Sequence, residues 1–360
     1  MKLLERYIAR QFVVTFLFSG LSFVALFVLI SLVENLDEFI DRNIAIRDIA
    51  MYYLNGLPET FLITTPISVL LASLFVTGRM SMQNELPAVK SAGVSMTMLL
   101  KPFLTVCLVI TLLNIINSCW IVPATYERKN EFESTRLEKA FTSSGKSTDL
   151  HIRESQNRML SIGYLRPDHT GGYSVSLESF NGPVLTSRID ADSFRYIPSK
   201  KQWVFFQTRT RYFSAEEEQF TFNRETAPFR LSFTPETFRI INADPDEMNL
   251  FQLHRFIRQQ TKAGFSSLER AKIKFHAKIA LPCASLIIVL IGVPLSTRKK
   301  RSGLAIEAGL SLFVGFLYLG MQKTLSTIGY RGIIDPFLAA WLPNILFLCV
   351  GLQLCKWANR

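Results

Sequence analysis

The stretch Gly78–Ser95, GRMSMQNELPAVKSAGVS, is a short polar interruption between two long apolar runs. It carries the signals of a short helix: Asn84 can cap the N-terminus, and Glu85 falls in the first turn, where the helix dipole favours an acid. Gly93 is placed to end the helix. We therefore predict a water-exposed helix at about residues 82–93.

Three apolar residues of this stretch, Met82, Leu86 and Val89, recur at i, i+4 and i+7. Side chains at this spacing share one face of a helix. The predicted helix is thus amphipathic, and in the cytosol it would offer a contact to a soluble partner.

The composition of the whole chain favours a membrane protein. Of its 360 residues 49% are hydrophobic and only 19% are charged. Its five cysteines lie in or beside apolar runs without a CxxC spacing, so we expect neither a disulfide framework nor a zinc site. Six apolar runs approach the length that crosses a bilayer, at about residues 12–33, 57–77, 102–122, 279–295, 304–325 and 337–355.

The segment between the third and fourth runs has a different pattern. From about residue 123 to 278 no apolar run approaches spanning length, and the pattern has a period of two residues. Apolar residues alternate with polar ones in Phe229–Phe233, and Trp203 and Phe205 are set against Val204 and Phe206. Turn-forming pairs such as Gly171-Gly172 separate these runs. We predict six transmembrane helices and an inserted all-β, jelly-roll-like domain of roughly eight strands. The expected limits are 1–122, 123–270 with flanking helices, and 271–360.

The basic cluster Arg298–Arg301 sets the expected orientation, because positive residues in short loops stay in the cytosol. This places both termini and the 78–95 loop inside. It places the acidic stretch 34–48 and the β-rich domain outside.

Motifs for catalysis are weak in this sequence. Ala140–Ser147 fits only the loosest form of a phosphate-binding loop, and it lacks the strand and helix that the motif needs, so a Ser/Gly-rich turn is the better interpretation. The four histidines show no HExxH spacing, and no GxSxG elbow occurs. We expect no catalytic residue, no metal and no cofactor. Nucleic-acid binding is disfavoured because the net charge of +11 is explained by the margins of the spans.

Arg270, Lys274 and Lys278 form a basic series at i, i+4 and i+8 where the fourth span enters the membrane. One interpretation is an anchor that extends toward lipid headgroups. The other is a clamp for the phosphates of an amphiphilic lipid.

The plan of six spans, an inner helix after the second span and an outer β domain after the third resembles the lipopolysaccharide export permeases, the LptF/LptG family. The resemblance covers essentially the whole chain. It rests on the opening motif Leu4–Ile8, on Asn84–Leu86 with Ala92–Ser95, on the exit at Pro123, on Lys278–Pro282 with Gly292–Leu295, and on Ala340–Asn344. The opening and closing motifs look more like the LptG branch.

The resemblance implies an ABC transporter without cofactor or catalysis of its own. In that family two permeases, here an LptF-like partner beside this chain, each present the inner helix to one subunit of a cytosolic, LptB-like ATPase dimer. The residues that match this coupling pattern are Asn84, Glu85, Leu86, Val89, Ala92 and Gly93. ATP and Mg²⁺ belong to the ATPase.

The resemblance also implies a path for lipopolysaccharide from the Gram-negative inner membrane to LptC- and LptA-like periplasmic bridge proteins. Some family members carry several lysines at the outer end of the first helix, but here acids dominate and Arg42 is the only base nearby. Lipid phosphates would then be met by Arg42 or by Arg270, Lys274 and Lys278. The alternatives left open are a permease for another lipid or lipoprotein, and a scaffold or sensor that needs no ATPase.

Overall fold

The computed structural model describes residues 2–136, 148–155, 157–166, 170–182, 184–199, 202–213, 218–223, 227–229, 231, 235, 244–262, 268–296 and 304–358. The chain divides into two compact units. The helical unit comprises Met1–Phe132, Pro245–Leu253 and Glu269–Arg360, and the sheet unit comprises Glu133–Asp244 and His254–Leu268.

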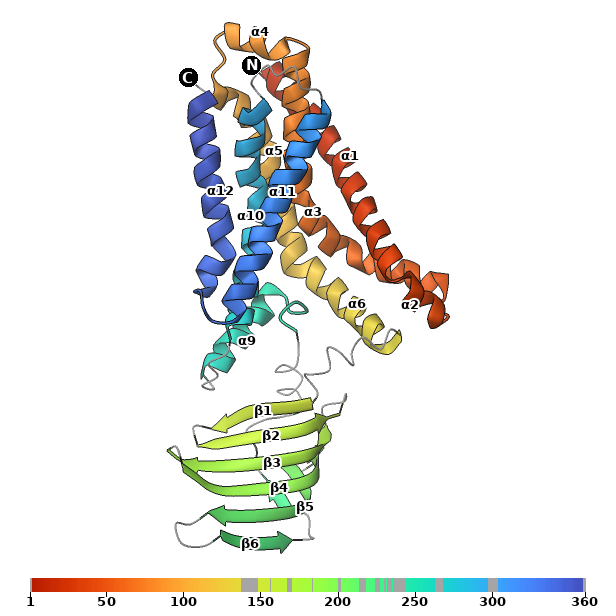
Figure 1. Ribbon diagram of the computed structural model, residues 1–360, viewed down its shortest axis with the longest axis vertical. Helices are drawn as coiled ribbons and strands as arrows, with labels where there is room; N and C mark the ends of the chain where they lie inside the picture. Colours follow the sequence, from red (N-terminus) through yellow and green to blue (C-terminus); the bar gives the residue numbers. More distant parts are fainter. Residues whose placement is uncertain are drawn as a thin grey trace. The chain divides into compact units, whose positions relative to one another are not determined.

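The helical unit is a bundle in which two helices, α3 and α10, contact most of the others. In Figure 1 the short helix α4 lies at the end of the bundle that carries both chain termini, and α2 lies at the opposite end. The helices of the described chain are α1 (Lys2–Glu34), α2 (Leu36–Asp41), α3 (Ile46–Met82), α4 (Glu85–Ser91), α5 (Met96–Ile116), a π-helix (Asn117–Ile121), α6 (Val122–Arg136), α9 (Leu250–Lys262), α10 (Glu269–Ser296), α11 (Leu304–Tyr330) and α12 (Pro336–Ala358). The last residues of α6, from Glu133, and most of α9, from His254, belong to the sheet unit.

Within the described residues, five helical stretches are long and apolar enough to cross a membrane. They are Leu3–Glu34, Ile46–Met82, Met96–Glu133, Glu269–Ser296 and Pro336–Ala358. The expectation of a multi-pass helical protein is thereby confirmed for five of the six predicted runs. The remaining run, 304–325, is the fifth in chain order. It lies in α11, a helix of 27 residues.

Buried polar side chains hold the bundle together where the helices cross. The Tyr318 hydroxyl donates to Asn344 Oδ1 at 2.8 Å, and Asn344 Nδ2 donates to the Ala280 carbonyl at 2.7 Å, so α10, α11 and α12 share one network. Asn117, the first residue of the π-helix, donates to the carbonyl of Pro58 in α3 at 2.9 Å. Such hydrogen bonds pair polar groups for which lipid offers no partner. These groups include backbone groups left unpaired by a proline inside a membrane helix.

Small residues allow the closest helix contacts. A Cβ atom placed on Gly292 of α10 would lie 2.0 Å from Ser73 Oγ and 3.0 Å from Leu70 Cδ1 of α3. The absence of a side chain at Gly292 therefore brings α10 and α3 together, in the way that small residues do at membrane helix interfaces.

The sheet unit contains one antiparallel sheet in the order β1-β2-β3-β4-β5-β6, and β7 pairs with the first part of β5. Consecutive strands are neighbours, as Figure 1 shows, so the described strands form a meander. A jelly roll is not shown by these residues. The strands are β1 (Thr148–Ser155), β2 (Arg158–Leu165), β3 (Gly171–Asn181), β4 (Val184–Ile197), β5 (Gln202–Phe213), β6 (Glu218–Asn223) and β7 (Ala227–Phe229). Phe233, at the end of the predicted run Phe229–Phe233, lies outside the described residues.

One face of the sheet is apolar and buries large aromatic side chains. Phe194, Trp203 and Phe205 are each at most 2% exposed and form one cluster with Leu160 and Leu177. This alternation follows from the two-residue period of the strands, which puts every second side chain on the same face.

Three neighbouring strands carry paired charges. Arg188 donates from Nε to Asp190 Oδ1 at 2.8 Å and from Nη1 to Glu178 Oε1 at 3.1 Å. The hydrogen bond to Asp190 raises the pKa of the Arg188 guanidinium above its ordinary value. These charges are satisfied within the sheet, so we assign them a structural role.

Candidate functional site

The short helix α4 is defined by sharp turns at both ends. Two residues separate it from α3, and the second, Asn84, has a left-handed backbone with φ of 59°. At the other end Gly93 has φ of +82°; its N–H donates to the Lys90 carbonyl at 3.0 Å, and the Val94 N–H donates to the Val89 carbonyl at 3.3 Å. This pair of bonds is a Schellman motif, and it confirms that Gly93 ends the helix.

The apolar side of α4 faces the bundle. Leu86 is 1% exposed and belongs to the same core cluster as Ile8, Met80 and Met96. Val89 is half-buried, whereas Ala92 and Gly93 are exposed. The prediction that Leu86 lies on an exposed apolar face is therefore wrong: the hydrophobic effect uses this side chain to hold α4 against the membrane helices.

Glu85 is the acid of this helix, and it is half-buried. The Tyr7 hydroxyl, near the start of α1, donates to its two carboxylate oxygens at 3.3 and 3.4 Å. Tyr7 also lines a groove between α1 and α3 together with Arg10 and Arg79. Glu85 thus lies beside a basic region at one end of the bundle.

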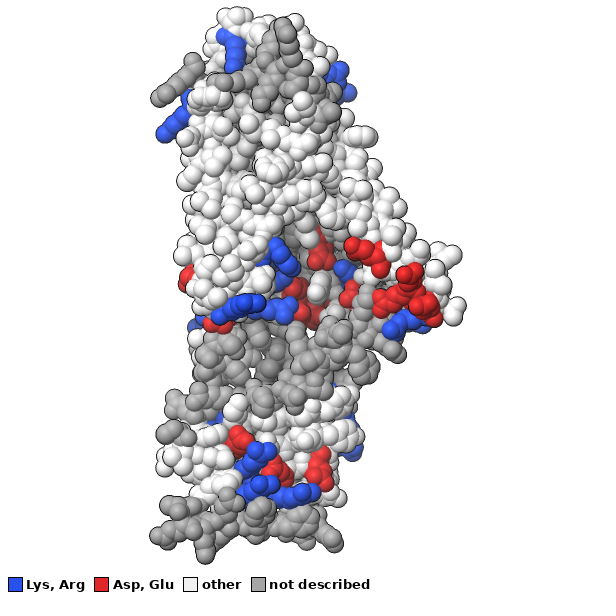
Figure 2. Space-filling view, viewed as in Figure 1, with Lys and Arg blue, Asp and Glu red and all other residues white. Residues whose placement is uncertain are grey.

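Charged side chains gather again at the end of the helical unit away from α4 (Figure 2). Asp246 accepts ion pairs from Lys274 at 2.7 Å and from Arg270 at 3.8 Å. Lys129 of α6 pairs with Glu59 of α3 at 3.4 Å. Two of the four predicted phosphate-binding cations, Arg270 and Lys274, therefore already have a carboxylate partner.

A cavity of about 330 Å³ opens beside this cluster. Lys278 lines it, is 8% exposed, and donates to the Ser118 carbonyl in the π-helix at 3.5 Å. Gln322 is 6% exposed, and neither its Nε2 nor its Oε1 has a hydrogen-bond partner among the described residues. The lining comprises Glu59, Leu62, Ile63, Ser118, Val122, Tyr126, Asp246, Lys274, Ala277, Lys278, Leu281, Leu319, Gln322, Lys323, Ser326 and Tyr330.

Comparison with known proteins gives a match to the family described as lipopolysaccharide export system permease LptF/LptG, over residues 6–357. The chain belongs to this family. It is therefore a multi-pass permease of the lipopolysaccharide export system in the inner membrane, a transmembrane subunit and not an ATPase.

Relatives of this permease share low sequence identity over most of their length. The lipopolysaccharide export system permease protein LptF of Escherichia coli (strain K12) is 21% identical over 311 residues, which are 84% of this chain and 80% of the relative. LptF of Shigella flexneri gives the same values. These LptF relatives do not distinguish the LptF branch from the LptG branch.

The permease departs from the sequence expectations at several site residues. Asn84 does occupy the N-cap position, but its side chain makes no capping hydrogen bond, because the residue is used for the left-handed turn between α3 and α4. Met82 ends α3 and does not belong to α4. Arg42 lies exposed at the end of α2, and it is not among the residues that line the cavity.

The three basic residues of the series on α10 differ in how exposed their side chains are. The side chain of Arg270 is 48% exposed and that of Lys274 is 29% exposed, whereas Lys278 is buried. Lys274 and Lys278 both line the cavity, whereas Arg270 is not among its described lining residues.

Three residues near these sites carried no recognisable signal in the sequence. Tyr7 and Glu85 are 78 residues apart, and Asp246 is 24 residues from Arg270 in a polar connection. Gln322 is followed directly by Lys323 near the end of a predicted span, and polar residues at that position are the signal that could have drawn attention to it.

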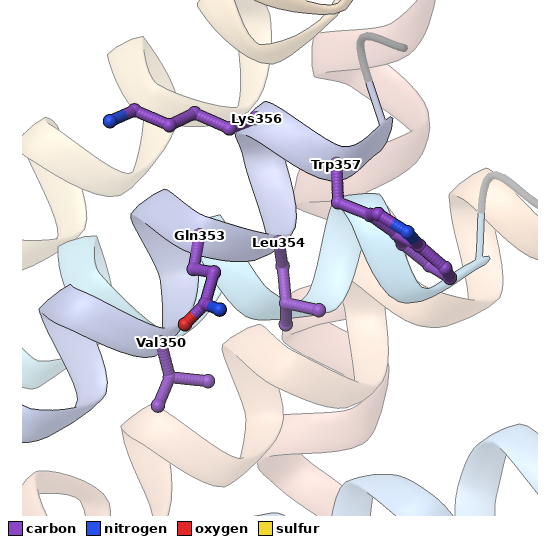
Figure 3. A pocket seen from close by; sticks show the side chains of 5 residues that line it. All are labelled: Val350, Gln353, Leu354, Lys356 and Trp357. Atoms are coloured by element: carbon purple, nitrogen blue, oxygen red, sulfur yellow. The ribbon is translucent and has the colours of Figure 1, made fainter.

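A further hollow runs along the end of α12 (Figure 3). Its described lining residues, Val350, Gln353, Leu354, Lys356 and Trp357, all come from this one helix, so we assign no site to it. Arg298–Arg301 and Ala140–Ser147 lie outside the described residues. No group of three or more His, Cys, Asp or Glu side chains in the described ranges could hold a metal ion.

Proposed function

We propose that this permease is one half of an ABC transporter that extracts lipopolysaccharide from the inner membrane and passes it to a periplasmic bridge. The observation that carries the proposal is the family match over residues 6–357. The energy comes from ATP hydrolysis by a separate LptB-like dimer, and the second half is an LptF-like permease. LptC- and LptA-like proteins receive the lipid.

The proposed contact with the ATPase is α4. Glu85 supplies a carboxylate at its start, and the exposed residues Ala92 and Gly93 mark its far end. Leu86 and Val89 hold α4 against the membrane helices behind this contact, because Leu86 is part of the bundle core. Asn84 sets the angle at which α4 leaves α3.

Replacement of Glu85 tests this coupling. We expect Glu85→Ala and Glu85→Lys to uncouple ATP hydrolysis from export, because the carboxylate is removed or its charge is reversed. The measurement is export in a complementation assay, together with ATPase activity of the purified complex. Ser91→Ala, on the same short helix, is the matched control. Unchanged export in both Glu85 variants would remove the coupling role.

We further propose that six helices cross the membrane, with α11 as the fifth, and that α4 and both termini face the cytosol. The length of α11 and its apolar composition support a span.

The proposal also includes a jelly-roll-like periplasmic domain and the domain limits 1–122, 123–270 and 271–360. The apolar face of the sheet around Trp203 and Phe205 supports the proposal that this domain shelters the acyl chains of the lipid. The motifs Leu4–Ile8 and Ala340–Asn344 support the LptG branch.

Lipid phosphates are the proposed partners of Arg42, Arg270, Lys274 and Lys278. Asp246 competes for two of these cations, so a phosphate would have to share them with it. We expect the combined replacement of Arg270, Lys274 and Lys278 by Gln to weaken photo-crosslinking to phosphorylated lipid. Lys272→Gln, on the same helix, is the control. Crosslinking that persists in the triple variant would exclude this role.

A further inference from the structure

Two helices of the permease enclose a groove at the end of the bundle that carries α4. Tyr7, Arg10 and Val14 of α1 line one side of it, and Phe75 and Arg79 of α3 line the other. The three residues of α1 lie at i, i+3 and i+7, so they share one face of that helix. The volume of the groove, about 450 Å³, falls within the range of about 300–1,000 Å³ that is usual for ligand pockets.

The charge in this groove has one sign. Arg10 and Arg79 are both exposed, and no acid is among the described lining residues. Within the described part of the chain, neither guanidinium pairs with a carboxylate. The nearby carboxylate of Glu85 accepts its hydrogen bonds from the Tyr7 hydroxyl, at 3.3 and 3.4 Å. The two arginines, whose planar guanidinium groups suit phosphate oxygens, can therefore bind an added anion.

The lining residues are arranged by depth in the membrane. Arg10 lies just before the apolar run 12–33, and Arg79 lies just after the apolar run 57–77. Val14, Phe75 and Val76 lie inside these runs. With α4 on the cytosolic side, both bases lie at the level of the lipid headgroups and the apolar lining lies at the level of the acyl chains. The groove thus matches a molecule with an anionic head and an apolar tail.

Basic residues at the cytosolic margin of a span commonly act only as anchors for the helix. Two features distinguish this pair from separate anchors. Arg10 and Arg79 come from different helices and line the same groove, and they lie at matching depths. Basic pockets between membrane helices on the cytosolic side are typical sites for anionic lipid headgroups.

We propose that this groove binds one anionic phospholipid of the cytosolic leaflet. Arg10 and Arg79 bind its phosphodiester, and an acyl chain packs along Val14, Phe75 and Val76. The inference rests on the proposed function, because that function places this end of the bundle in the cytosol. The bound lipid is a component of the surrounding membrane and not the exported cargo.

Native mass spectrometry of the full-length chain in its transporter complex tests the inference. The probes are phosphatidylglycerol, phosphatidylethanolamine with the same acyl chains, and inorganic phosphate as a competitor. The first variant combines Arg10→Gln with Arg79→Gln, and the second, Val14→Trp, fills the groove but keeps both charges. The matched control combines Arg6→Gln with Lys101→Gln, because these exposed residues are not among the described lining residues.

We expect the double arginine variant to lower the affinity for phosphatidylglycerol by about tenfold or more, because two charge-assisted contacts are lost. Binding of phosphatidylethanolamine, which has no net charge, is expected to stay unchanged in this variant. Val14→Trp is expected to weaken phosphatidylglycerol binding although it removes no charge. Assembly of each variant complex, seen in the same spectra, shows that the chain has folded.

Three results would overturn the inference. The first is equal affinity of the wild-type complex for the two phospholipids, and the second is an equal loss of phosphatidylglycerol binding in the control variant. The third is displacement of phosphatidylglycerol by inorganic phosphate, which would make the groove a site for a free anion. Export by the Glu85 variants tests the proposed function without reference to this groove, so failure of that function is distinguishable from failure of this inference.

Discussion

Single hydrogen bonds between buried side chains join helices that are far apart in the sequence. Tyr318 on α11 and Asn344 on α12 are 0% and 1% exposed, and Asn344 bridges to the backbone of α10. Within a membrane such a bond has no water to replace it, so its loss leaves a buried acceptor unpaired.

Removing the Tyr318 hydroxyl tests this at the residue scale. We expect Tyr318→Phe to lower the free energy of unfolding by about 1–3 kcal/mol, because Asn344 Oδ1 loses its donor. The measurement is unfolding of the purified permease in detergent. Tyr7→Phe is the control, since Tyr7 is exposed and its loss is expected to change stability by less than about 0.5 kcal/mol. Equal effects of the two variants would contradict the prediction.

The spacing of the candidate site residues in the sequence did not predict the direction in which their side chains face. A step of four residues on an α-helix turns by about 40° more than a full circle, so residues at i, i+4 and i+8 drift around the axis. This drift takes the series from exposed Arg270 to buried Lys278. The period predicted one apolar face for Met82, Leu86 and Val89, but Met82 lies in α3 and only Leu86 and Val89 share α4. Periodicity alone cannot say whether such a face meets a partner or the protein's own core.

At the scale of elements, close packing of α10 on α3 depends on Gly292. We expect Gly292→Ala to destabilise the permease by about 1–3 kcal/mol, because the new methyl group overlaps Ser73 and Leu70. The unfolding midpoint in detergent measures the effect.

Gly320→Ala is the matched control for this prediction. Gly320 lies in α11, and no atom outside its own turn lies within 4 Å of an added Cβ. Alanine there gains helix propensity and costs no space, so we expect unchanged or slightly higher stability. A loss of stability at Gly320 equal to that at Gly292 would show that packing is not the cause.

Helix lengths were predicted less well than helix positions. Hydropathy predicted a second span at 57–77, whereas α3 runs for 37 residues. The bilayer sets the length of an apolar run, but the backbone can continue its helical hydrogen bonds beyond the hydrocarbon, and α3 does so although it contains Pro58 and Pro66. The π-helix at 117–121 left no sequence signal, since its extra residue is accommodated by contacts such as Asn117 with Pro58.

At the scale of the whole molecule, the proposed orientation can be tested by chemical labelling. Ser91 on α4 and Ser199 in the sheet unit are both exposed. In a background without the native cysteines, we expect Ser199→Cys to react with a membrane-impermeant thiol reagent added from the periplasmic side. Ser91→Cys reacts only after the inner membrane is opened. The reverse pattern would overturn the orientation.

The sequence was sufficient to predict one helical part and one β-rich part of the chain, because an apolar helical pattern and a two-residue strand pattern differ strongly. The order of the strands was not, since a meander and a jelly roll use the same alternation of residues. Pairing partners such as Leu160 with Leu177 are set by cross-strand contacts, which a single sequence does not display.

The burial of Leu86 has a mechanical consequence. A loop attached only by its two ends would bend when a protein pulled on Glu85, and the work would be lost as local motion. Here the side chain next to Glu85 is fixed in a core shared by α1, α3, α5 and α10. Close-packed protein interiors have low compressibility. Under the proposed coupling through α4, a push on this helix would therefore move four helices at once, and the stiffness of this one contact would determine how much of an ATPase stroke arrives in the membrane.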